Sequence, residues 1–104
     1  MNELNDLQDW YAAQCDGEWE HSHGVKIESC DNPGWWVKID LKRTALEEVP
    51  FSAIQEGDSH PTNPQGEWMR CYVQDHIFHG AGDPAKLQKV LHIFLDWAKR
   101  YKQS

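Results

Sequence analysis

Two stretches of alternating apolar and polar residues, one on each side of a turn, constrain this chain more than any other feature. Apolar side chains occupy every second position in residues 24–28 and again in residues 35–42. A period of two is typical of strands with one buried face. The intervening Asp-Asn-Pro-Gly at residues 31–34 supplies turn chemistry, because Asp and Asn bond their own backbone, Pro fixes φ and Gly tolerates positive φ. We therefore expect a hairpin whose face away from the core carries Lys26, Glu28, Trp36, Lys38 and Asp40.

Further strands are indicated downstream. Residues 67–78 alternate again and predict a third strand, while residues 51–54 predict a short edge strand, since Pro50 excludes a central position. Residues 57–66 are dense in Gly, Pro, Asn and Ser and predict an exposed loop. Residues 79–82, His-Gly-Ala-Gly, predict the turn from the last strand into a helix.

Two helices are expected at the ends of the chain. Residues 3–15 place apolar side chains on one helical stripe, and Asp83-Pro84 is a favoured start for a second helix with a broad apolar stripe over residues 87–101. The sequence predicts a single domain over residues 1–104. Its class is α+β, with a three- to four-stranded antiparallel sheet and the N- and C-terminal helices packed on one face.

Charge narrows the classes of partner. The chain has 17 acidic and 10 basic residues, a net charge of −7, and residues 1–83 alone hold 16 acids against 5 bases. This balance argues against a nucleic-acid binder and favours a basic protein partner. The N-terminus has neither the basic nor the apolar region of a signal peptide, and no apolar run is long enough to cross a bilayer, so we expect a cytoplasmic protein.

Catalytic and metal-binding patterns are weak. Cys30 and Cys71 could serve a small cysteine-dependent enzyme or a sulfur carrier, which stays open as an alternative, but neither has the positive surroundings that a reactive thiolate needs. His21 and His23 would need a second ligand pair drawn from residues 75–79 to close a zinc site. We therefore expect no catalytic residue, no metal and no cofactor.

Aromatic and acidic side chains together suggest a binding surface. Tryptophan and tyrosine give large contact area at low entropic cost, and carboxylates steer a basic partner. The candidate partner-binding residues are Asp16, Glu18, Trp19, Glu20, Trp36, Asp40, Trp68, Tyr72 and Asp75.

The order and spacing of many short motifs also resemble the bacterial immunity protein 53 family of polymorphic toxin systems. The resemblance runs nearly end to end. It is carried by residues 7–11 with Gln14, residues 17–21, 24–28, 31–35 and 39–41, Pro50-Phe51, Trp68 with Cys71, Val73 and Asp75, Phe78 with Gly80, and residues 87–97.

The resemblance implies an α+β immunity protein without catalysis of its own, the antitoxin partner of a cognate protein toxin. Our hypothesis is that the acidic, Trp-bearing surface occludes a basic active site, for example that of a nuclease. A generic acidic adaptor for another basic protein is the alternative that the sequence leaves open.

Overall fold

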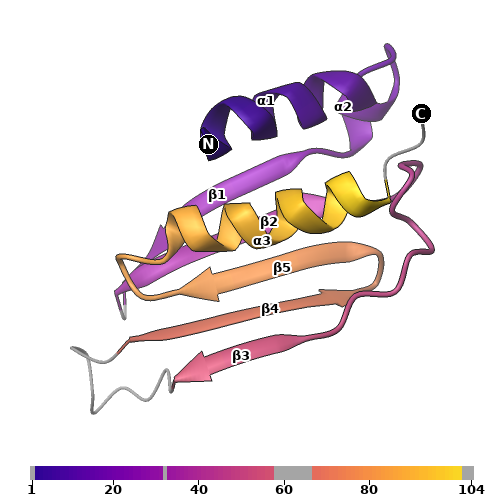
Figure 1. Ribbon diagram of the computed structural model, residues 1–104. Helices are drawn as coiled ribbons and strands as arrows, with labels where there is room; N and C mark the ends of the chain where they lie inside the picture. The colour runs from indigo at the N-terminus through magenta and orange to yellow at the C-terminus, as the bar shows by residue number, and fades with distance from the viewer. Residues whose placement is uncertain (1, 32, 58–66, 102–104) are drawn as a thin grey trace.

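The computed structural model describes residues 2–31, 33–57 and 67–101, and these form two layers (Figure 1). A five-stranded antiparallel sheet, in the order β1-β2-β5-β4-β3, is one layer, and the helices α1 and α3 lie side by side over one of its faces. No helix in this part of the chain is long and apolar enough to cross a membrane. The elements in chain order are α1 (Glu3–Gln14), α2 (Trp19–Ser22), β1 (Val25–Cys30), β2 (Gly34–Asp40), β3 (Ile54–Gly57), β4 (Trp68–Gln74), β5 (Ile77–Gly82) and α3 (Leu87–Arg100).

The hairpin of β1 and β2 is confirmed. Val25 pairs with Ile39 and Ile27 with Val37, so the apolar residues of both strands lie on the helix side. Val37 and Ile39 are fully buried, whereas Ile27 remains 36% exposed because β1 is an edge strand that the helices cover incompletely.

The predicted count of three to four strands is wrong, because residues 67–82 form two strands and not one. A two-residue turn, Asp75-His76, joins β4 to β5, and both residues have positive φ, 56° and 62°. Positive φ at both central positions matches the right-handed twist of the flanking strands. Asp-His carries a weaker turn signal than Asn-Gly, so this hairpin was not predicted from the sequence.

The predicted strand break at residues 79–82 is likewise wrong, since these residues lie in β5. Gly80 is there for packing: a Cβ at this position would collide with Cγ1 of Val90 in α3. The small residue therefore lets the helix approach the sheet.

The edge strand expected at residues 51–54 exists but begins at Ile54. Phe51 instead packs edge-on against Phe78 and Trp97, with ring centroids 5.5 Å and 5.0 Å apart. Of the predicted loop at residues 57–66, Gly57 ends β3 and the rest lies outside the described residues.

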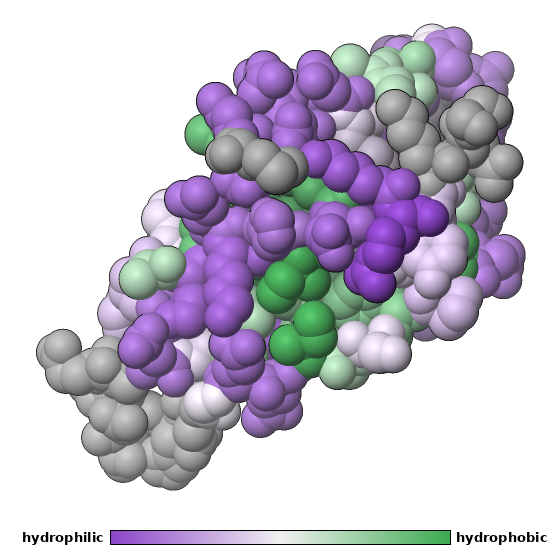
Figure 2. Space-filling view, in the orientation of Figure 1, coloured by the Kyte–Doolittle hydropathy of each residue, from purple (hydrophilic) through white to green (hydrophobic). Residues whose placement is uncertain are grey.

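The core lies between the sheet and the two helices. Phe94 of α3 is fully buried and meets Trp10 of α1 edge-to-face at 5.0 Å, which fastens the helices to each other. The surface over the helices is mostly hydrophilic, with apolar side chains showing in the middle of this face (Figure 2). Among the apolar residues that pack only partly on the core are Ile54, Val73 and Ile93.

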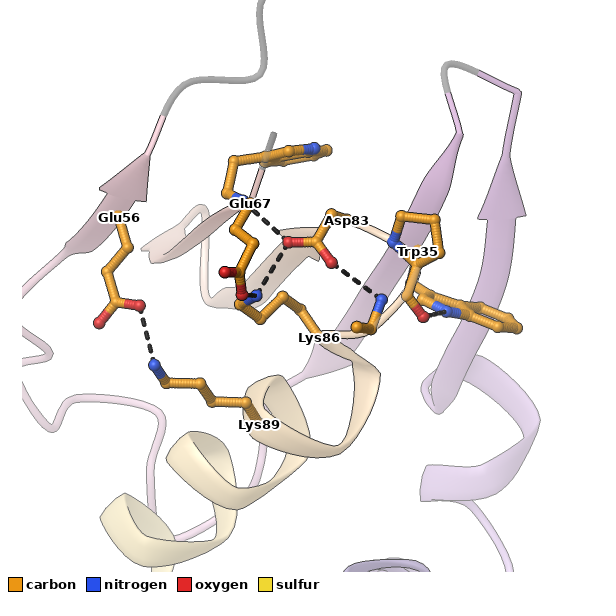
Figure 3. A network of polar contacts seen from close by, with 9 residues as sticks. Trp35, Glu56, Glu67, Asp83, Lys86 and Lys89 are labelled. Atoms are coloured by element: carbon orange, nitrogen blue, oxygen red, sulfur yellow. Dashed lines mark hydrogen bonds and ion pairs between the residues drawn. The ribbon is translucent and has the colours of Figure 1, made fainter. Parts of the chain in front are cut away.

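The last helix begins at Leu87 and not at the predicted Asp83-Pro84. The Asp83 carboxylate instead accepts hydrogen bonds from the backbone N–H groups of Trp68 (2.8 Å) and Ala85 (2.9 Å) and contacts Lys86 Nζ at 3.0 Å (Figure 3). Burial opposes ionisation of Asp83, but these hydrogen bonds outweigh it, and the pKa of Asp83 is lowered. The network fixes the β5–α3 connection to the start of β4.

Candidate functional site

Carboxylates gather at one end of the sheet, where β1 begins and β4 turns into β5. We call this set, Asp16, Glu18, Glu20, Glu47, Glu48 and Asp75, the acidic rim. Contacts connect its parts. The Arg43 guanidinium lies 3.6 Å from the Glu18 carboxylate, and the Arg43 backbone N–H donates to Glu47 Oε1 at 3.3 Å. His76 Nδ1 lies 3.0 Å from the Glu47 carbonyl oxygen. These contacts connect the 16–20 segment, through the loop of Glu47, to the β4–β5 turn that contains Asp75.

Two carboxylates of the rim shape the loop that carries them. Asp16 Oδ1 accepts the N–H groups of Glu18 and Trp19, both at 2.9 Å, and the Glu20 carboxylate accepts those of Asp16 and Gly17. The N–H groups of Trp19 and Glu18 lower the pKa of Asp16. Backbone N–H groups, first that of Glu20 itself, lower the pKa of Glu20 as well. Both groups therefore keep their negative charge in mildly acidic solution.

The expectation that Trp19 is an exposed contact residue is wrong. Residues 19–22 form the short helix α2, and Trp19 is only 1% exposed. Its ring meets those of Trp10 and Tyr11 at 6.2 Å and 5.9 Å, and its Nε1–H donates to the Lys42 carbonyl oxygen at 2.8 Å. The acidic flanks suggested a surface position, but the indole is the anchor that holds the acidic segment on the core.

Glu47 and Glu48 are rim residues that the sequence pattern did not predict. No strand or helix period runs through residues 42–50, and the structure gives this segment a series of turns. Thr44 stabilises these turns, because its Oγ1 donates to the Leu41 carbonyl oxygen at 2.7 Å and accepts the Leu46 N–H at 3.1 Å. Two adjacent glutamates in a chain of net charge −7 were the available signal.

Most of the rim charge is uncompensated. Several carboxylates elsewhere do form ion pairs, as Asp6 does with Lys99, Glu56 with Lys89 and Asp96 with Arg100. On the rim, the exposed Glu18–Arg43 contact is the sole ion pair to Lys or Arg among the described residues. A pair with side chains 77% and 56% exposed neutralises little. The rim is therefore a source of negative potential.

The sheet face opposite the helices, here the outer face, is not acidic. Cross-strand register places Lys26, Lys38, His79 and Tyr72 in one row and Glu28, Trp36, Ala81 and Arg70 in the next. This face therefore carries three cationic side chains, Lys26, Lys38 and Arg70, and two carboxylates, Glu28 and Asp40. The acidic segment and this face were predicted to form one acidic, Trp-bearing surface, and in the structure they are separate.

The remaining predicted residues lie on the outer face or at its borders. Trp36 is 46% exposed and lies under Lys38, whose Nζ is 4.8 Å from the ring centroid. Tyr72 stacks on His79 at 4.8 Å, and Trp68 is half-buried. The Asp40 carboxylate is occupied, since it contacts His23 Nδ1 and accepts the Lys42 N–H, at 2.8 and 2.9 Å. Trp36 is the aromatic side chain of this set most available to a partner.

The thiol and histidine candidates find little support. Burial raises the pKa of the Cys71 thiol to about 12, so this residue is no thiolate near neutral pH. His21 is exposed, and His23 is turned toward Asp40. Within the described ranges, one group of three could hold a cation, Glu47, Glu48 and His76, with ligand atoms within 4.8 Å of one another.

The molecule is thus a small α+β domain with a preformed acidic end and a solvent-facing sheet, and comparison assigns it to a family. The model of the immunity protein 53 family matches residues 4–99. The chain therefore belongs to the immunity protein 53 family, and the resemblance read from its motifs is confirmed. Immunity proteins neutralise toxins. No curated protein and no solved structure matches the chain.

Proposed function

We propose that this immunity protein neutralises its cognate toxin by placing the acidic rim over a basic, substrate-binding surface of the toxin domain, such as the active-site groove of a nuclease. The observation that carries the proposal is the unpaired charge of the rim. Five of its carboxylates form no ion pair with a Lys or Arg side chain among the described residues. Unpaired carboxylates on a fixed framework suit a cationic surface, because they are already assembled before binding.

The framework supports this role because hydrogen bonds fix the rim in place before binding. Backbone N–H groups hold the carboxylates of Asp16 and Glu20, and the Trp19–Lys42 hydrogen bond joins the 16–20 segment to the loop that carries Glu47 and Glu48. Little conformational entropy is then lost when the toxin binds. The side chains of Glu18, Glu48 and Asp75 remain exposed for direct contact.

Trp36 is our proposed aromatic anchor on the outer face, toward the end of the sheet away from the rim. It is a large, exposed side chain on a rigid central strand, and truncation of such an anchor typically costs about 2 kcal/mol or more of binding free energy. Tyr72 and Asp40 would lie between Trp36 and the rim, and Trp68 would border the contact at the other end of the sheet, where β4 begins.

Charge reversal tests the rim. The variant Glu18→Lys/Glu47→Lys/Glu48→Lys is expected to weaken toxin binding by about 100-fold or more and to abolish protection of cells that express the toxin. The matched control is Asp9→Lys/Asp96→Lys/Glu56→Lys, which changes the net charge equally at exposed carboxylates away from the rim. An equal loss of toxin binding in both variants would mean that only net charge matters, and it would contradict the rim as the interface.

A generic acidic adaptor would use the same surface. The two functions are distinguished by the partner: purified rim variants should lose the ability to inhibit the catalytic activity of the toxin encoded beside this gene. Inhibition that survives all three rim reversals would contradict our proposal.

A further inference from the structure

The free edge of β1 is an interaction surface that the rim does not use. In the order β1-β2-β5-β4-β3, β1 is an edge strand and pairs only with β2 among the described strands. It contains neither proline nor a bulge, two of the devices that protect an edge, although it carries the charged side chains of Lys26 and Glu28. Four of its six residues are exposed.

The backbone groups at this edge can be assigned. Asp40 donates its N–H to the Gly24 carbonyl at 3.0 Å, and these two residues are opposite each other in the register that continues into β1 and β2. Hydrogen-bonded pairs alternate along an antiparallel ladder. Residues 26 and 28 therefore bond to β2, while Val25, Ile27 and Ser29 direct their N–H and C=O groups toward the free edge.

The side chains of β1 complement a second copy of the same strand. An antiparallel pair of β1 strands centred on Ile27 places Ile27 opposite Ile27, and Lys26 opposite Glu28 twice over. Opposite charges directly across a strand pair stabilise it, and like charges oppose it. The charge order of this strand thus favours self-pairing.

Ile27 also explains why the edge gains from a partner. It points to the helix side of the sheet yet stays 36% exposed. Leu4 and Tyr11 of α1 are 62% and 38% exposed and line a groove between α1 and the start of β1. A twofold axis perpendicular to the sheet keeps the helices of both copies on one side, so the exposed part of Ile27 in one copy would lie beside Ile27 of the other, and the groove at the start of each β1 would face the end of the partner strand.

We propose that the protein forms a twofold dimer through antiparallel β1–β1 pairing centred on Ile27, which joins two sheets into one. This inference goes beyond toxin neutralisation and does not depend on it. None of the rim residues belongs to the paired strands.

Sedimentation velocity of the full chain over a range of concentrations tests the dimer. The parent should shift from monomer to dimer as concentration rises. Lys26→Glu and Glu28→Lys, each of which creates two like-charge contacts, should weaken the dimer by about 10-fold, and the swap Lys26→Glu/Glu28→Lys should restore it. The rescue is the decisive result, because a purely structural role of either residue would not give it.

A backbone variant gives an independent reading. Ile27→Pro removes an N–H that the monomer does not use, so the variant should fold, as judged by circular dichroism, and sediment as a monomer. A parent that remains monomeric at all concentrations, a swap that fails to restore the dimer, or a folded Ile27→Pro variant that still dimerises would each overturn the proposal.

Discussion

The indole N–H of Trp19 donates a hydrogen bond of 2.8 Å to the carbonyl oxygen of Lys42. This bond joins α2 to the loop that carries Glu47 and Glu48, and it is shielded because Trp19 is 1% exposed. The acidic rim therefore has a buried aromatic support.

Trp19→Ala should destabilise the fold by about 3–5 kcal/mol, since it leaves a cavity under α2 and an unpaired carbonyl. Urea unfolding followed by circular dichroism measures this. Trp19→Phe, which keeps most of the ring but loses the donor, should lie between the parent and Trp19→Ala. If Trp19→Ala weakened toxin binding while leaving stability unchanged, the indole would be a contact residue after all.

The unpaired rim charge predicts that toxin association is steered electrostatically. The association rate constant, measured by stopped-flow fluorescence, should fall by about 10-fold or more between roughly 0.02 M and 0.5 M salt. In the variant Glu47→Lys/Glu48→Lys the same salt series should be much flatter, with the change mainly in the association rate. A parent rate that is independent of salt would contradict steering by the rim.

The lowered pKa of Asp83 predicts that the free energy of unfolding decreases in acid. Its pKa is lowered in the folded protein, so its stabilising contribution is fully present above the unfolded value of about 3.9 and is lost as the pH falls through the lower folded value. The difference in unfolding free energy between the parent and Asp83→Asn should therefore be large at neutral pH and shrink below about pH 4.

The control for this pH series is Asp96→Asn, an exposed carboxylate whose pair with Arg100 spans one helical turn. It should change stability little at any pH. A difference for Asp83→Asn that does not vary with pH would assign the effect to lost packing instead of the lost charge.

The limits of sequence reasoning are visible in single residues. The hairpin at Val25–Asp40 was predictable because its apolar and polar residues alternate and its turn residues are characteristic. Asp75 and His76 were not recognised as a turn. A two-residue turn with positive φ at both positions is usually signalled by Asn and Gly, and Asp-His lacks that signal.

The candidate site shows the same division. Local pattern identified the acidic segment of Asp16, Glu18 and Glu20, but only tertiary packing could reveal that Trp19 points inward. Only the folded chain brings Glu47 and Glu48 beside His76 of the β4–β5 turn, since the hydrogen bond between Leu41 N–H and the His76 carbonyl oxygen joins segments far apart in sequence.

Gly80 offers a direct test of how α3 sits on the sheet. Gly80→Ala should destabilise the protein by about 1–3 kcal/mol, because its Cβ would collide with the Val90 side chain and push the helix from β5. Gly24→Ala is the matched control: nothing lies within 4 Å of a Cβ there, so its change should stay within about 0.5 kcal/mol. Denaturant titration compares both with the parent. Equal stability of the two variants would mean that α3 does not approach β5 this closely, and residues 79–82 would lose their packing explanation.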